Sequence, residues 1–231
     1  MSSLPSLHLS EPFNSPQSVM ATIGGEDFAQ YILHARNIVE GRPYSSTGYL
    51  INPYTVDIGP QNYPPLMPLA LALLYALSGM CLGAFKTEMT TLLLTALLAV
   101  YVLVRTRQGH VRALAVAAMV GFNPHFADAK NSIGSDFLFL LLVYVCLYVF
   151  EKTRWRDEEP WWRGTFVGLL FYLTYATRSL GLVLLPAAFV SDLMRFRTPR
   201  KSTAISISVV CMLIFCQGTA LSRRPAIREY L

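Results

Sequence analysis

The longest polar interval of this 231-residue chain begins with Gly24-Gly25-Glu26-Asp27 and ends with Tyr63-Pro64-Pro65-Leu66-Met67-Pro68. From Asp27 onward the apolar residues recur with the period of a helix, and Gly41 followed by Pro43 provides a stop. The pattern predicts an amphipathic helix of about three to four turns that lies on a membrane surface. Residues 44–65 are rich in Gly, Pro, Asn, Ser and Tyr, and are expected to be irregular.

The composition of the whole chain is that of a membrane protein. Hydrophobic residues make up 53% of the chain and charged residues only 14%, whereas soluble proteins carry about 25% charged residues. The net charge of +5 is distributed in short clusters between apolar runs, as topology signals are, and not as a nucleic-acid-binding surface. We therefore expect an all-α fold: a multi-spanning helical membrane protein with an outer loop that bears the amphipathic helix.

Four segments follow from this pattern. Residues 1–22 hold no long apolar run and no Lys or Arg, so they are expected to be a disordered lead-in without a secretory signal peptide. Residues 23–68 are the outer, extracytoplasmic loop, residues 69–221 the transmembrane helical region, and residues 222–231 a short basic tail.

The basic clusters predict which ends of the helices lie together. Residues 105–112, 152–163 and 195–201 are rich in Lys and Arg, which is typical of cytoplasmic loops. Placing all three clusters inside requires two crossings between each successive pair. This arrangement leaves Asp136 and Arg178 on the outside.

Asp27 lies on the same side if one full crossing precedes the first basic cluster. Residues 1–65 hold five acids and two bases, which favours the outside. Lys86-Thr87-Glu88 is expected to interrupt the apolar sequence, so that residues 66–83 form an interfacial or re-entrant helix and residues 89–104 cross. If residues 66–83 instead span fully, Asp27 is separated from the other two outer residues.

Neither cysteine nor histidine spacing indicates a metal centre. The four cysteines lie inside apolar runs, without a CxxC pair or a histidine at metal-binding spacing, and the four histidines are scattered. We expect Cys81, Cys146, Cys211 and Cys216 to be free, buried thiols.

Among the charged residues, Arg178 is the one whose position is hardest to explain by a purely structural role. It lies between two apolar runs with no basic neighbour, where a charged residue usually serves a site or pairs with another charge. Its planar fork suits a phosphate or a carboxylate. Asp27 and Asp136 each also fit the role of a helix-start acid, worth about 0.5–2 kcal/mol. Together the three residues could supply a general base, a carboxylate that orients the acceptor or holds a divalent cation, and a cation for a departing phosphate.

These residues fall within four motifs in one order along the chain. Gly25-Glu26-Asp27-x3-Tyr31-x3-Ala35-Arg36-Asn37-x3-Gly41 is followed by Tyr63-Pro64-Pro65-Leu66-x-Pro68, then Ser135-Asp136-Phe137-Leu138-Phe139, then Thr177-Arg178-x2-Gly181-Leu182-x-Leu184-Leu185-Pro186. On these motifs the chain resembles, roughly from residue 24 to residue 221, the polytopic GT-C glycosyltransferases of the protein mannosyltransferase and aminoarabinose transferase type, the family-39-like group.

The resemblance implies transfer of a sugar from a polyprenyl-phosphate-linked donor to a glycan, lipid or protein acceptor on the extracytoplasmic face. Asp27 corresponds to the catalytic acid of the first outer loop, and the adjacent Glu26 is a second candidate. Asp136 corresponds to the second acidic motif, which orients the acceptor or a metal, and Arg178 to the donor-phosphate contact. No metal is specified, so a divalent cation is the one cofactor left open.

The resemblance is to a shortened member of that group. Members usually have a transmembrane helix before the Asp27 loop and further helices beyond the position of Leu231, so the sequence corresponds to a member truncated at both ends. We expect an integral multi-pass protein of the bacterial cytoplasmic (inner) membrane whose partners are the lipid bilayer, the donor and the acceptor, and not nucleic acid.

Two alternatives to an active transferase fit the sequence. One is a non-catalytic or remnant membrane subunit that keeps the fold. The other is a small transporter, which predicts charged residues in mid-span along a path. The charges of this chain lie at the ends of apolar runs, which favours a transferase over a transporter.

Overall fold

The computed structural model describes residues 26–44, 46–47, 63–129, 132–153 and 160–222. Every regular element within these residues is a helix, which confirms the all-α class. The predicted lead-in, the tail beyond residue 222 and most of the stretch 44–65 lie outside the described residues. The elements are α2 (Glu26–Val39), α3 (Leu66–Ser78), α4 (Leu82–Gln108), α5 (His110–Gly121), α6 (Pro124–Ala129), α7 (Asp136–Thr153), α8 (Trp161–Thr177), the 3-10 helix η1 (Ser179–Val183), α9 (Leu184–Phe196) and α10 (Lys201–Ser222).

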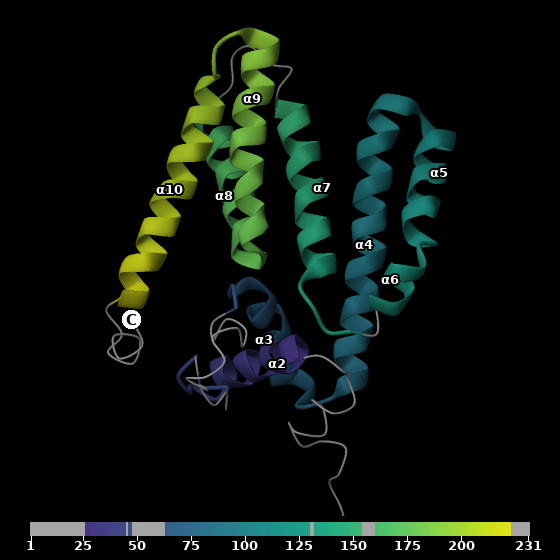
Figure 1. The fold of residues 1–231 in the computed structure, drawn as a ribbon, viewed down its shortest axis with the longest axis vertical. Coiled ribbons are helices and arrows are strands. Elements are labelled where there is room, and N and C mark those ends of the chain that lie inside the picture. Colours follow the sequence, from purple (N-terminus) through teal and green to yellow (C-terminus); the bar gives the residue numbers. More distant parts are fainter. Residues whose placement is uncertain (1–25, 45, 48–62, 130–131, 154–159, 223–231) are drawn as a thin grey trace, which may run out of the picture.

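The helices form an upright bundle with two helices across one of its ends (Figure 1). α4, α7, α8, α9 and α10 run alongside one another, and α5 stands beside α4 at one edge. α2 and α3 lie together at one end, which we call the α2 end. The opposite, basic end is where α4 gives way to α5, α7 ends and α9 gives way to α10. Its described basic residues are Arg105, Arg107, Arg112, Lys152, Arg163, Arg195, Arg197, Arg200 and Lys201.

Within the described part of the chain, three helical segments are long and apolar enough to cross a membrane: Leu82–Gln108, Ser179–Phe196 and Lys201–Thr219. α3 has 13 residues and α5 has 12, so each extends about 18–20 Å, short of a hydrocarbon core of roughly 30 Å. Among the described residues before α5, α4 is therefore the element with the length to cross. This fits the interfacial placement predicted for residues 66–83.

The break between α3 and α4 lies earlier in the chain than predicted. Lys86-Thr87-Glu88 does not interrupt a helix but lies inside α4. The chain turns instead at Gly79, whose φ of +64° belongs to the left-handed region that glycine tolerates. Lys and Glu are good helix formers, and the Thr87 hydroxyl donates to the Gly83 carbonyl oxygen (2.9 Å), so this polar triplet continues the helix.

Two apolar clusters hold the helices together. The first joins α2 and α3 to α4 and α7, where Ile32, Met67, Phe85 and Phe137 are almost fully buried. At the water-facing α2, removing such a side chain from water contributes about 1.5–3 kcal/mol. The second cluster joins α7 through α10 around Cys146. The amphipathic helix is thus fixed over one end of the bundle by its apolar face.

α8 and α10 approach each other closely because α8 has glycines where the two helices meet. A Cβ at Gly164 would lie 2.8 Å from the Ser202 carbonyl oxygen, and a Cβ at Gly168 would lie 2.8 Å from the Ser206 carbonyl oxygen. The Ser206 hydroxyl also donates to the Gly164 carbonyl oxygen (2.8 Å). Small residues four apart that permit such close contact are typical of helix pairs in membranes.

Candidate functional site

Arg178 lies at a sharp bend between α8 and η1. α8 ends at Thr177, and Arg178 takes an extended backbone conformation (φ −150°, ψ 139°) before η1 turns the chain back. The turn depends on Gly181, where a Cβ would lie 2.5 Å from the carbonyl carbon of Thr174. The arginine that the sequence places between two apolar runs is therefore presented at a helix end.

The guanidinium of Arg178 contacts two residues at the start of α7. Its Nη1 lies 2.6 Å from Oδ1 of Asp136, and its Nε donates to Oγ of Ser135 (3.1 Å). The side chains of Arg178 and Asp136 are 39% and 53% exposed. Among the described residues, no partner contacts Nη2. The structure thus brings Arg178 and Asp136 together.

Ser135 extends this contact to the amphipathic helix. Its buried hydroxyl lies 3.0 Å from the phenol oxygen of Tyr31 in α2, and the Tyr31 ring packs on Tyr63 with centroids 4.7 Å apart. Tyr31, Ser135, Arg178 and Asp136 therefore form a continuous polar series that links α2, α7 and the end of α8. We call these four residues the Arg178 chain.

Glu26 and Asp27 lie in the first turn of α2. Asp27 precedes Tyr31 by four residues, which is about one turn of the helix backbone. The side chains of Glu26 and Asp27 are outside the described part of the structure. The backbone of α2 nevertheless places both acids about one helical turn from the Arg178 chain.

The described residues contain no group of three His, Cys, Asp or Glu side chains that could hold a metal ion. The four cysteines are free, as predicted, but only Cys146 is buried. The expectation of buried thiols is wrong for Cys81, Cys211 and Cys216, which are exposed on the helix surfaces. The apolar runs that hold them form the outside of a bundle whose surroundings are as apolar as its interior.

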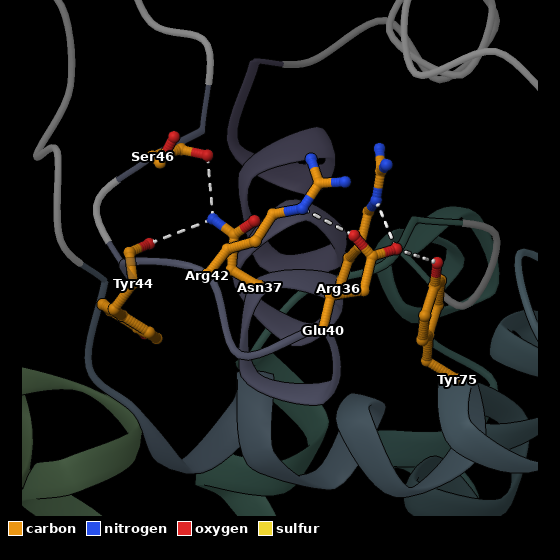
Figure 2. A network of polar contacts seen from close by, with 7 residues as sticks. All are labelled: Arg36, Asn37, Glu40, Arg42, Tyr44, Ser46 and Tyr75. Atoms are coloured by element: carbon orange, nitrogen blue, oxygen red, sulfur yellow. Dashed lines mark hydrogen bonds and ion pairs between the residues drawn. The ribbon is translucent and has the colours of Figure 1, made fainter.

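Buried polar side chains of α2 hold the chain segment that follows it. Nδ1 of His34 lies 2.7 Å from the Tyr44 carbonyl oxygen, and the two rings stack with centroids 4.0 Å apart. The Asn37 amide donates to the Ser46 carbonyl oxygen (2.8 Å; Figure 2). Burial lowers the pKa of His34 below its usual value of 6.5, against the opposing effect of the Tyr44 contact. The ring is therefore neutral near pH 7 and donates through Nδ1.

A surface network links the end of α2 to α3 (Figure 2). Oε1 of Glu40 accepts from Nε of Arg36 (2.8 Å) and from the hydroxyl of Tyr75 (3.1 Å), and Nε of Arg42 lies 2.7 Å from Oε2. The hydrogen bond from Arg36 is the main reason that the pKa of Glu40 is lower than usual. Since Tyr75 belongs to α3, the carboxylate joins the two helices that cover the α2 end.

The sequence pattern singled out Arg178 and Asp136 but gave no role to Ser135, Tyr31 or His34. For two of these residues a signal was present, because Ser135 directly precedes Asp136 and Tyr31 lies within the first motif. His34 had no such signal, since its partner is a backbone carbonyl that only the folded chain brings near.

A family model described as dolichyl-phosphate-mannose-protein mannosyltransferase matches residues 62–218, which is more than half of the chain. The matched region contains Asp136 and Arg178 and begins after α2, so Glu26 and Asp27 lie outside it. No curated protein and no solved structure matches the chain.

Proposed function

Because the chain belongs to the dolichyl-phosphate-mannose-protein mannosyltransferase family of membrane glycosyltransferases, we propose that it transfers a sugar from a polyprenyl-phosphate-linked donor. The acceptor is a hydroxyl group of a glycan, lipid or protein on the extracytoplasmic face. The reaction takes place at the α2 end of the bundle, beside the Arg178 chain.

The observation that carries this proposal is the position of the Arg178 guanidinium. Asp136 and Ser135 hold it from one side, and Nη2 has no partner among the described residues. A guanidinium fixed in this way can accept a phosphate with little loss of side-chain freedom, and its fork matches phosphate oxygens. The bend at residue 178 presents this group at the end of an apolar helix, where a lipid phosphate would lie.

In the proposed reaction the acceptor hydroxyl oxygen attacks the anomeric carbon of the donor sugar. The bond between that carbon and the phosphate oxygen breaks, and its electron pair remains on the polyprenyl phosphate. Asp27, or Glu26 beside it, takes the acceptor proton as general base. Arg178 balances the negative charge of the departing phosphate. The ion pair with Arg178 favours an orienting role for Asp136 over that of a metal ligand.

The charge distribution supports the proposed side of the membrane. Most of the described basic residues belong to the helix ends opposite α2, and Lys and Arg are enriched on the cytoplasmic side. The α2 end then faces outward. The bacterial cytoplasmic membrane stays a prediction from the sequence. Single cysteines at positions 27, 136 and 178, in a chain without its native cysteines, should all react with a reagent that does not cross the membrane.

The transfer assay uses membranes that contain the full chain and short-chain polyprenyl phosphates that carry radiolabelled mannose, glucose or aminoarabinose. It measures the label that moves from the donor to membrane acceptors. Asp27→Asn and Arg178→Gln should each lower transfer by about 100-fold or more. Arg163→Gln, at the basic end, is the matched control and should leave transfer unchanged.

Three results would contradict the proposal. An Arg178→Gln chain as active as the Arg163→Gln control removes the phosphate role of Arg178. Reaction of position 27 from the cytoplasmic side alone puts the proposed base on the wrong face. An unaltered chain that transfers no sugar from any donor of the panel favours the non-catalytic subunit instead.

A further inference from the structure

A cavity of about 460 Å³ lies between α4, α7, α8 and α9. Its walls are largely apolar and include Leu103, Leu147, Phe150, Phe171 and Leu184. None of the residues that line it belongs to the Arg178 chain. The lining residues of α4 and α7 belong to the last turns of these helices, so this part of the cavity lies near the basic end. It is therefore a second site, separate from the proposed transfer site.

The cavity lies between segments that are long and apolar enough to span a membrane. α4 forms one wall, and the span Ser179–Phe196 forms another. Ala187, on the cavity wall, is exposed, so the space is reached from the side of the bundle. The medium at that depth of a bilayer is acyl chain and not water. A volume of this size falls within the usual 300–1,000 Å³ of small-molecule sites.

The rim of the cavity carries an unevenly exposed ion pair. Nη2 of Arg107 contacts Oε2 of Glu151, yet the Arg107 side chain is 58% exposed and that of Glu151 only 17%. The carboxylate is thus covered while the guanidinium faces the surroundings. Arg107 is the basic residue among those that line the cavity. Basic pockets between transmembrane helices on the cytoplasmic side attract anionic lipid headgroups.

We propose that this cavity binds one acyl chain of an anionic bilayer phospholipid, and that Arg107 binds the phosphate of its headgroup. The apolar walls explain the preference for an acyl chain, and the exposed face of Arg107 explains the preference for negative charge. The bound lipid fills the space between α4 and α9 on the cytoplasmic half of the bundle. Neither property depends on the transferase reaction.

The charge half of the proposal is tested by native mass spectrometry of the full chain, purified in detergent and titrated with dioleoylphosphatidylglycerol or dioleoylphosphatidylcholine. The unaltered chain should bind phosphatidylglycerol more tightly. Arg107→Gln should weaken that binding by about fivefold, the effect expected of one basic residue near an anionic headgroup. Arg105→Gln is the matched control, because Arg105 lies on the same helix end but does not line the cavity.

The shape half is tested by filling the cavity. Ala187→Phe places a ring on the cavity wall and should abolish retention of the lipid, whereas Val190→Phe adds a ring at an exposed position of the same helix outside the lining. Equal retention by the Ala187→Phe and Val190→Phe chains would overturn the proposal. Equal binding of phosphatidylglycerol by the Arg107→Gln and Arg105→Gln chains would also overturn it. A dimer of the unaltered chain that Ala187→Phe breaks would overturn it as well, because a second copy of the chain would then occupy the cavity in place of a lipid. The charge variants keep the proposal testable if Ala187→Phe fails to fold.

Discussion

The guanidinium of Arg178 lies 2.6 Å from the carboxylate of Asp136, and each charge is at the helix end that favours it. Asp136 is in the first turn of α7, and Arg178 directly follows the last residue of α8. Negative charge is stabilised at a helix N-terminus and positive charge at a C-terminus. The antiparallel helices thus support an ion pair that is half exposed.

The first prediction concerns this ion pair. Asp136→Asn should lower kcat/KM for the polyprenyl-phosphate donor by about fivefold, because a partly exposed charged pair is worth about 1 kcal/mol. The remaining contact between Arg178 and Ser135 keeps the loss small. Steady-state kinetics with the same donor measure it, and Glu151→Gln at the basic end is the control. Unchanged kinetics would show that Asp136 does not orient the arginine.

The second prediction concerns the turn after Arg178. Gly181→Ala should reduce transfer by about 100-fold, since its Cβ would collide with the Thr174 backbone and displace the arginine. Gly218→Ala is the control, because no atom lies within 4 Å of a Cβ there. Thermal unfolding of both variants in detergent separates a local displacement from a general loss of structure. A Gly181→Ala chain with normal transfer would exclude a role for this close approach.

The third prediction concerns the contact between α8 and α10. Gly168→Ala should lower stability by about 1–3 kcal/mol, the usual effect of forcing an extra methyl group into a packed interface. The Ser206 backbone would lie 2.8–2.9 Å from the added methyl carbon and cannot move away without separating the helices. Gly83→Ala in α4, where the nearest contact is 3.9 Å, should be neutral or slightly stabilising. Equal unfolding midpoints for the two variants would show that α10 can shift freely.

The fourth prediction concerns pH. The pKa of His34 is lowered in the folded protein, so below pH 6.5 the unfolded chain binds more protons than the folded one. The contribution of His34 to stability is complete above pH 6.5 and is lost as the pH falls toward the lowered pKa. The rate of amide hydrogen exchange in α2, corrected for intrinsic rates, should therefore increase as the pH is lowered from 7.5 to 5. His34→Gln should remove that dependence and His125→Gln, at an exposed histidine, should retain it.

The fifth prediction concerns the Glu40 network. Glu40→Gln removes the charge that Arg36 and Arg42 share and should increase amide exchange at the end of α2 in low salt. The effect should be small because the network is on the surface, and it should vanish at 1 M salt, where charges are screened beyond about 3 Å. A difference that persists at high salt would instead indicate a packing role for Glu40.

The sequence predicted the elements whose signals are local. The helical period after Asp27 and the glycine at position 41 predicted α2, and the isolated charge of Arg178 predicted a site or a charged partner, which is Asp136. Lys86-Thr87-Glu88 was misleading, because polarity alone does not end a helix whose backbone hydrogen bonds continue. The bond between Ser135 and Tyr31 could not be predicted, since it depends on how α2 packs across the start of α7.

The separation of charge along the bundle has a consequence for how the protein stays in place. In the proposed orientation the arginines and lysines of the basic end lie on the side that a respiring cell keeps electrically negative. Carrying one positive charge across 100 mV costs about 2.3 kcal/mol. The voltage therefore acts as a standing force against inversion of the protein. In the proposed orientation, this voltage helps to keep Arg178 on the outer side of the membrane.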